Sequence, residues 1–170
     1  LTAMTPSTVG TGTGPVSVTV DPSGRYAYVT NYVSNTVSQY IIGATGGLTA
    51  MSPATVVTGA GPNWIAIDPS GRYAYVANMN GTTVSQYTVG ADGRLTAMGT
   101  SAVASGAEPS SVAVDPTGRY AYVSNWGGST VSQFTIGTGG SLTIMATPGV
   151  TAEASPISVT VDPSGRYVYV

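Results

Sequence analysis

The chain has 170 residues with five Arg, no Lys, seven acidic residues, no His and no Cys, and its formal net charge is −2. Charged residues make up 7% of it, against about 25% in a typical soluble protein. Without His or Cys, a disulfide framework, a Cys/His zinc site and a Ser–His or Cys–His nucleophile are excluded, and we expect no metal or cofactor. No basic cluster is present to neutralise phosphates, so we expect no nucleic-acid partner. No apolar run approaches the roughly 20 residues of a membrane span.

The sequence repeats with a period of 47 residues. The segment DPSGRYAYV begins at Asp21 and returns, with at most one change, at Asp68, Asp115 and Asp162. The register holds outside this motif without insertion or deletion, so the chain comprises three full units and 29 residues of a fourth. A period of this length with four strands per unit is typical of a β-propeller.

The first repeat predicts four short strands. In chain order they are VSVTV at 16–20, YAYVTN at 26–31, TVSQYII at 36–42 and a fourth that begins with LTAM at 48–51. β-Branched and aromatic residues fill these segments, and clusters of Gly, Pro, Asn and Ser bound them. No window has the 3.6-residue period of a helix.

We therefore predict an all-β propeller built of four-stranded antiparallel blades, with about 3.6 blades in this chain. It forms one partial domain over residues 1–170. The expected parts are an outer strand at 1–10, blades at about 15–57, 62–104 and 109–151, and an incomplete blade at 156–170.

Alternation within the strands predicts that both faces of a blade are buried. Tyr26 and Tyr28 share one face of the second strand, and the smaller Ala27 and Val29 share the other. We interpret the tyrosines as spacers between blades whose hydroxyl groups need hydrogen-bond partners.

The segment between the first two strands predicts a tight turn. Asp21-Pro22-Ser23-Gly24 combines the residues that such turns prefer, and Arg25 follows and is expected to reach back to Asp21. Because every repeat carries this pair, we interpret it as structural rather than catalytic. The four pairs are Asp21 and Arg25, Asp68 and Arg72, Asp115 and Arg119, and Asp162 and Arg166.

The repeat resembles that of the YVTN-repeat β-propellers. Residues 28–31 read YVTN, and the later copies read YVAN at 75–78 and YVSN at 122–125. That family consists mostly of seven-bladed propellers, includes archaeal and bacterial surface-layer and cell-surface proteins, and is similar to the lactonase propellers exemplified by 6-phosphogluconolactonase. For lactonases the resemblance implies a central funnel with polar residues that include His and Arg. This chain has no His, and four of its five arginines lie in the turns.

The loops that differ most between repeats predict the position of a binding site. The loops after the second strand and those between blades share one face of a propeller, and loops on a rigid scaffold usually carry function. The candidate ligand- or partner-binding residues there are Tyr32, Asn63, Trp64, Met79, Asn80, Glu108, Trp126 and Glu153.

Two residue types among these candidates suggest specific chemistry. Trp64 replaces a Ser found in the other three repeats; an exposed Trp anchors a sugar, a peptide or a protein, although either Trp could instead fill a gap between blades. Glu108 and Glu153 are the only glutamates. As a pair they could bind a cation or act as acid and base, and alternatively they are solvated loop carboxylates.

Low charge, Ser- and Thr-rich strands and the lack of a potent catalytic side chain favour a non-enzymatic propeller. We expect an extracellular or cell-surface protein with a structural, adhesive, or protein- or glycan-binding role. The alternative is a lactonase-like enzyme of the 6-phosphogluconolactonase type with catalytic residues outside this stretch.

Both ends of the sequence fall inside a blade, which leaves unpaired strand edges. We expect other protein to pair with them. It would be the remaining blades of a longer propeller, which we favour, or further copies of this chain that self-associate.

Overall fold

The computed structural model describes residues 7–170, which form fourteen β-strands and no helix. Accordingly, this part of the chain contains no helix that could cross a membrane. The strands are β1 Pro15–Val20, β2 Tyr26–Asn31, β3 Thr36–Ile42, β4 Leu48–Val57, β5 Pro62–Ile67, β6 Tyr73–Asn78, β7 Thr83–Val89, β8 Leu95–Ala104, β9 Pro109–Val114, β10 Tyr120–Asn125, β11 Thr130–Ile136, β12 Leu142–Thr151, β13 Thr160–Val161 and β14 Val168–Tyr169.

The expected outer strand at 1–10 lies largely outside the described residues. Residues 8–14 lead into β1 without regular secondary structure.

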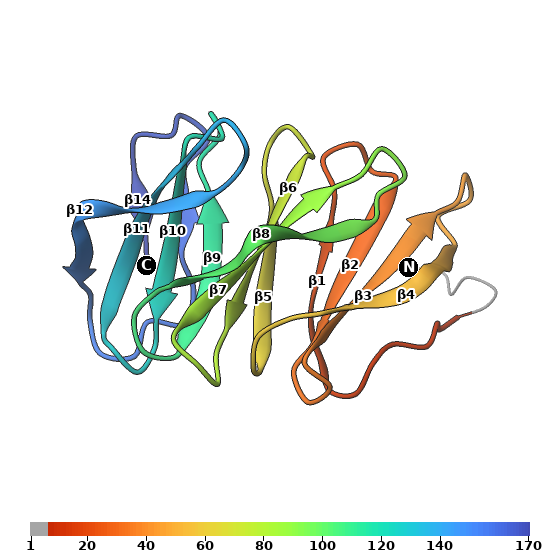
Figure 1. Ribbon diagram of the computed structural model, residues 1–170, viewed down its shortest axis with the longest axis horizontal. Helices are drawn as coiled ribbons and strands as arrows, with labels where there is room; N and C mark the ends of the chain where they lie inside the picture. The colour runs from red at the N-terminus through yellow and green to blue at the C-terminus, as the bar shows by residue number, and fades with distance from the viewer. Residues whose placement is uncertain (1–6) are drawn as a thin grey trace.

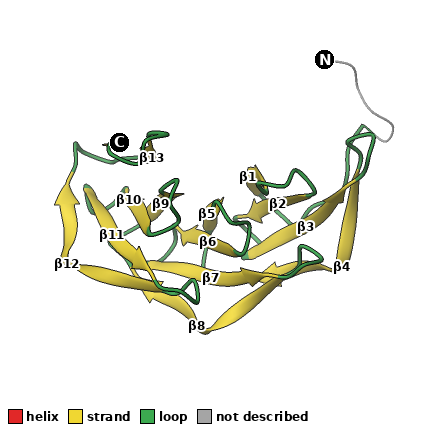
Figure 2. Ribbon diagram, turned by 90° about the horizontal axis from the view of Figure 1, so that it is seen from above, coloured by secondary structure: helices red, strands yellow, loops and turns green. Residues whose placement is uncertain are grey.

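Each full repeat folds into one antiparallel four-stranded sheet. The strand orders are β1-β2-β3-β4 in the first blade, β5-β6-β7-β8 in the second and β9-β10-β11-β12 in the third, and β13 pairs with β14. The blades stand side by side (Figure 1) along an arc, with β1, β5 and β9 on its inner side and β4, β8 and β12 on its outer side (Figure 2). The prediction of an all-β propeller with four-stranded antiparallel blades is confirmed.

Buried side chains connect each blade to the next. The hydroxyl of Tyr28 donates to the carbonyl oxygen of Gly93 at 2.6 Å, and Tyr75 makes the same contact one repeat later. Gln39 accepts the backbone N–H of Leu95 at 2.7 Å. Both tyrosines are completely buried, so the interpretation of these side chains as spacers with partnered hydroxyls is confirmed for them.

A buried asparagine at the end of the second strand anchors the loops of each full blade. In the second blade the Nδ2 group of Asn78 donates to the hydroxyls of Thr83 and Ser85 at 3.0 and 2.9 Å. A Cβ on Gly59 would lie 2.5 Å from this side chain, so only glycine fits there. The same hydrogen bonds recur in the other two full blades. The loops are thus held alike, although their sequences differ.

An aspartate organises the turn between the first two strands of each blade. The carboxylate of Asp115 accepts the backbone N–H groups of Thr117, Arg119 and Tyr120 at 2.8–3.1 Å, and the Thr117 hydroxyl as well. Gly118 adopts φ 69°, a left-handed conformation that favours glycine. The carboxylate therefore satisfies backbone donors that the tight turn leaves without carbonyl partners.

The arginine of this turn contacts its aspartate through the backbone rather than through the guanidinium group. The Arg119 guanidinium carbon lies 5.5 Å from the centroid of the Tyr120 ring, which is a cation–π distance. Within residues 7–170 the one ion pair between side chains joins Arg94 to Asp92.

The two ends of the blades form two distinct faces. One face holds the turns after β1, β5 and β9 and the loops between the third and fourth strands. The hydroxyl of Tyr26, beside the first turn, donates to the carbonyl oxygen of Ala91 in the loop between β7 and β8 at 3.0 Å, so these two kinds of loop lie at the same end. We call this end the turn face. The loops after β2, β6 and β10 and the loops between blades form the opposite end, the loop face, along the lower edge of Figure 1.

Replacing the turn carboxylate is expected to destabilise the fold. Asp115→Ala leaves three backbone N–H groups without their charged acceptor and should lower the free energy of unfolding by about 2–3 kcal/mol. Urea unfolding monitored by tryptophan fluorescence measures this. Arg119→Ala is the matched control, because it removes exposed contacts only, the cation–π contact with Tyr120 and the hydrogen bond from Nε to the Thr117 hydroxyl, each worth about 1 kcal/mol or less. Equal losses in the two variants would contradict this account of the turn.

The same carboxylates make stability depend on pH. Burial raises the pKa of Asp115, but the hydrogen bonds of the turn, that of Thr117 foremost, outweigh it and hold the pKa below its ordinary value. Hydrogen bonds, first that of Ser164, lower the pKa of Asp162 to about 2. A pKa that is lower in the folded than in the unfolded chain gives stability that is complete above about pH 4 and is lost as the pH falls through the folded values. We expect the urea concentration at the midpoint of unfolding to decrease as the pH is lowered from about 4 to about 2. A midpoint that does not change over this pH range would refute the prediction.

Candidate functional site

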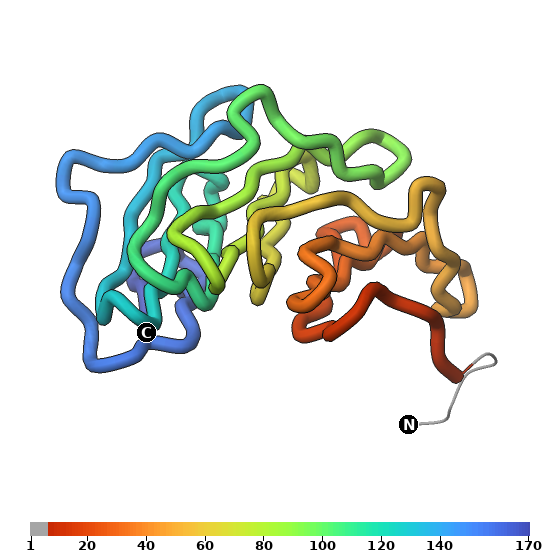
Figure 3. Tube along the Cα trace, turned by 60° about the horizontal axis from the view of Figure 1, so that its bottom comes forward, coloured from red at the N-terminus to blue at the C-terminus, as the bar shows by residue number. Residues whose placement is uncertain are grey.

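The loop face carries most of the residues that the sequence singled out, and Figure 3 turns this face toward the reader. Four of them follow the second strands, two lie in loops between blades, and two belong to an inner strand. They are Tyr32, Met79, Asn80 and Trp126 after β2, β6 and β10, Glu108 and Glu153 between blades, and Asn63 and Trp64 on β5.

Three of these residues meet around one hollow of about 430 Å³, which we call the loop-face hollow. It lies between the loop after β6 and the loop before β9, where the backbone N–H of Glu108 donates to the carbonyl oxygen of Gly81 at 3.1 Å. Two neighbouring blades thus place an amide and a carboxylate around one space. Its lining residues are Met79, Asn80, Gly81, Thr82, Ala107 and Glu108.

The first blade orients the Asn80 amide. The hydroxyl of Tyr32 donates to Oδ1 of Asn80 at 2.5 Å, across 48 positions of sequence. The Asn80 side chain lies close over Gly61, where a Cβ would come within 2.7 Å of it. Because Oδ1 is occupied, the Nδ2 group is left as the hydrogen-bond donor of this side chain.

Glu108 has a backbone conformation that residues with side chains rarely adopt. Its φ is 53°, and the residues at the same position of the two preceding repeats are Gly14 and Gly61, with φ 69° and 61°. The left-handed conformation costs an L-residue about 1–2 kcal/mol relative to the right-handed one. Strain of this kind concentrates at functional sites, where the surrounding structure maintains it.

Gly127 provides the space for the Glu108 side chain. A Cβ on Gly127 would lie 2.7 Å from the carboxylate oxygen Oε2. In the second blade the large and the small residue of this pair are exchanged, because Gly61 occupies the position of Glu108 and Asn80 occupies the position of Gly127. This exchange was not among the features expected from the sequence, although the two aligned columns of the repeat show it.

Trp126 and Trp64 both expose their indole groups. The backbone N–H of Trp126 donates to the carbonyl oxygen of Glu108 at 2.9 Å, and its side chain is 40% exposed. Trp64 is 42% exposed on the inner strand β5, whereas Ser17 and Ser111 at the same position are buried. The indole of Trp64 therefore extends beyond the space that a serine fills.

Asn63 makes a contact between blades. Its Nδ2 group donates to the carbonyl oxygen of Ser110 at 2.7 Å, which links the inner strands of the second and third blades.

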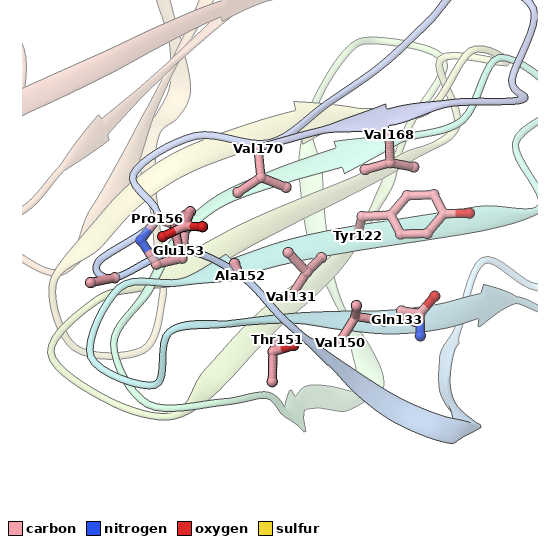
Figure 4. A pocket seen from close by; sticks show the side chains of 11 residues that line it. Tyr122, Val131, Gln133, Val150, Thr151, Ala152, Glu153, Pro156, Val168 and Val170 are labelled. Carbon is pink, nitrogen blue, oxygen red and sulfur yellow. The ribbon is translucent and has the colours of Figure 1, made fainter.

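Glu153 lies apart from Glu108, at a second hollow of about 500 Å³ between the third blade and β14 (Figure 4). Gln133 also lines that hollow. Its counterparts Gln39 and Gln86 accept backbone N–H groups of the following blade, so this hollow is a position of blade packing. The two glutamates line different hollows and do not form a pair.

Among residues 7–170 no group of three or more Asp or Glu side chains could hold a metal ion. The polar side chains that line the loop-face hollow are Glu108, Asn80 and Thr82, and Glu108 is the one that carries a charge.

Comparison with known proteins places the chain in a family. A family model described as lactonase, seven-bladed β-propeller, matches residues 2–170. The resemblance to lactonase-like propellers seen in the sequence is thereby confirmed. No curated protein matches the chain in sequence.

Solved structures share the fold at low sequence identity. A candidate 6-phosphogluconolactonase of Bacteroides fragilis is 24% identical with a TM-score of 0.80, over 91% of this chain and 46% of its own. The periplasmic gluconolactonase of Pseudomonas aeruginosa is 24% identical with a TM-score of 0.79, over 91% and 44%. Hydrazine synthase of Kuenenia stuttgartiensis is 21% identical with a TM-score of 0.73, over 91% and 41%. The chain thus spans less than half the length of these structures.

The family match corrects the main functional prediction. The sequence favoured a non-enzymatic structural or adhesive propeller, and this was wrong, because the matching family is that of the lactonases. That prediction was based on the low content of charged residues. Most of the charged residues lie in the repeated turns, so the low content is a property of the scaffold. The finding supports the alternative, a lactonase-like enzyme.

The strain at Glu108 predicts that its removal stabilises the protein. Glu108→Gly restores the residue of the first two repeats and should raise the free energy of unfolding by about 0.5–1 kcal/mol, after the greater freedom of glycine in the unfolded chain is counted. Urea unfolding provides the measurement. The matched control Gly61→Ala should destabilise, because φ there is 61° and a Cβ would meet Asn80. A less stable Glu108→Gly variant would show that the conformation is not strained.

Proposed function

This chain belongs to the lactonase family of seven-bladed β-propellers, and we propose that it serves the hydrolysis of a sugar lactone at the loop-face hollow. The observation that carries the proposal is Glu108, a carboxylate held in a left-handed backbone conformation beside that hollow. Its position is occupied by glycine in the first two repeats. Ser155, at the same position of the fourth repeat, has a similar φ of 57°, so the feature specific to the third blade is the carboxylate. A strained residue that carries a carboxylate beside a hollow is a candidate reacting group.

Glu108 has the chemistry of a general base for this reaction. The carboxylate accepts a proton from a water molecule while the water oxygen forms a bond to the lactone carbonyl carbon. When the tetrahedral intermediate collapses, the bond between that carbon and the ring oxygen breaks, and the proton passes to the ring oxygen. One lactone and one water give one hydroxy acid, and the carboxylate is regenerated.

Asn80 suits the charge that develops on the carbonyl oxygen. Tyr32 occupies its Oδ1 atom, so the Nδ2–H groups are the ones left to donate. A neutral donor oriented before the reaction stabilises an oxyanion without reorganisation. Trp126, whose backbone N–H is hydrogen-bonded to the carbonyl oxygen of Glu108, adds an exposed apolar surface beside these polar groups.

The extracellular or cell-surface location and the protein or glycan partners expected from the sequence stay predictions. A secreted or surface-attached hydrolase is compatible with this reaction, because lactone hydrolysis as written needs water alone as co-reactant.

The role of Glu108 predicts a large loss of turnover on substitution. Glu108→Gln keeps the shape of the side chain but removes its basicity, and kcat should fall by about 10²–10⁴-fold. Continuous titration of the acid released from glucono-δ-lactone, corrected for spontaneous hydrolysis, measures it. Asp92→Asn is the matched control, since it removes a loop carboxylate on the turn face and should leave kcat unchanged. Full activity of Glu108→Gln would exclude this base, and a wild-type chain that accelerates hydrolysis of no sugar lactone would overturn the proposal.

A further inference from the structure

Resting on the proposed lactone hydrolysis, we propose that the substrate is an uncharged sugar lactone that stacks on Trp64 and Trp126, and that phosphorylated sugar lactones are rejected. Charge is segregated between the two faces of the molecule, and the two exposed indole groups lie on the loop face.

The cations of this chain all lie at the turn face. Four arginines follow the turn aspartates, and the fifth, Arg94, lies in the loop between β7 and β8. The six residues of β9 separate the two faces by about 20 Å, at about 3.3 Å per residue. This distance exceeds the Debye length of about 8 Å at physiological salt, so these arginines cannot attract a phosphate group at the loop face.

Local contacts hold the arginines at that end. Arg94 pairs with Asp92 and donates from Nε to the carbonyl oxygen of Ser52 at 2.8 Å. The four turn arginines lie over the following tyrosine rings, with their guanidinium carbons 5.1–5.8 Å from the ring centroids.

The loop face presents carboxylates to a ligand. Glu108 lines the loop-face hollow, and Glu153 is exposed in the next loop between blades. A phosphate dianion carried by a substrate in the loop-face hollow would approach the Glu108 carboxylate, and the charge of Glu153 in the next loop would add a weaker repulsion, which disfavours binding. An uncharged lactone pays no such cost, and its hydroxyl groups can donate hydrogen bonds to the Glu108 carboxylate.

The exposed indoles provide the attraction that charge does not. Neither indole lines the loop-face hollow itself. Trp64 lies at the loop-face end of the inner strand β5, and Trp126 lies in the loop after β10, hydrogen-bonded through its backbone to Glu108. Both are at least 40% exposed. The C–H groups of a sugar ring stack on such an aromatic surface, as they do in many sugar-binding sites, and this contact requires no charge.

The first experiment compares two substrates that differ only in charge. With the full chain, kcat/KM for glucono-δ-lactone should exceed that for its 6-phosphate by at least about tenfold, and added salt should narrow the difference. Equal values, or a preference for the phosphate ester, would overturn this inference while leaving lactone hydrolysis in place.

Binding is measured independently of turnover. Gluconolactam is a stable neutral ring analogue, and Trp64 and Trp126 are the only tryptophans, so their fluorescence reports its binding directly. We expect the lactam to change the fluorescence and its 6-phosphate to bind at least about tenfold more weakly. If the lactam binds in this way but no lactone is hydrolysed, the proposed reaction fails and the ligand class stands. If the lactam does not bind, the ligand class fails.

Two variants separate stacking from charge. Trp64→Ser inserts the residue of the other three repeats, so the fold should be kept while KM for the neutral lactone rises about tenfold with little change in kcat. Glu153→Gln should raise kcat/KM for the 6-phosphate about threefold without affecting the neutral lactone. Arg72→Gln at the turn face is the control and should alter neither. An unchanged KM in Trp64→Ser, or an Arg72→Gln effect confined to the 6-phosphate, would contradict the inference.

Discussion

The packing of each blade against the next is the constraint on which the rest of this structure depends. Val18 on β1 is 64% exposed, whereas Ile65 and Val112 at the same position of the next two blades are almost completely buried. The apolar side chain at this position of the first strand is thus buried only where a preceding blade covers it. Tyrosine and glutamine side chains then cross the boundary and satisfy backbone groups of the neighbouring blade. Stability of this kind is a sum of contacts between neighbours, as in other repeat proteins.

Because contacts between the strands of neighbouring blades stabilise the fold, the loops can differ in sequence from one blade to the next. Packing and the buried asparagines fix the ends of the strands, so a loop can change sequence without disturbing the core. In the third blade a loop carries Glu108 in a left-handed backbone conformation, and Gly127 leaves space for its side chain. Elsewhere the charged residues maintain the scaffold: the turn aspartates bind backbone N–H groups, and the arginines lie on tyrosine rings at the turn face. A chemically distinct loop face is the result.

Much of the fold could be predicted because its signals are local and repeated. The strand expected at 16–20 begins one residue earlier, and those at 26–31 and 36–42 have the expected bounds, since turn residues on both sides define them. Side-chain contacts were harder to predict, because several hydrogen-bond donors compete for one acceptor. The guanidinium of Arg119 was expected to reach Asp115, but backbone N–H groups and the Thr117 hydroxyl already occupy that carboxylate. The functional interpretation failed for a related reason: low charge reflects the repeated turns and carries no information about chemistry on the opposite face.

The sequence by itself determined the blade: the 47-residue period, the alternation of large and small side chains and the turn chemistry all act within one repeat. Only the tertiary structure decided what the loop face presents. Tyr32 and Asn80 are 48 positions apart, and Glu108 meets the loop after β6 across a blade boundary. The side chain of Glu108 also needs the space above Gly127 in a separate loop. Such contacts arise from the way neighbouring blades stack, and no local propensity encodes them.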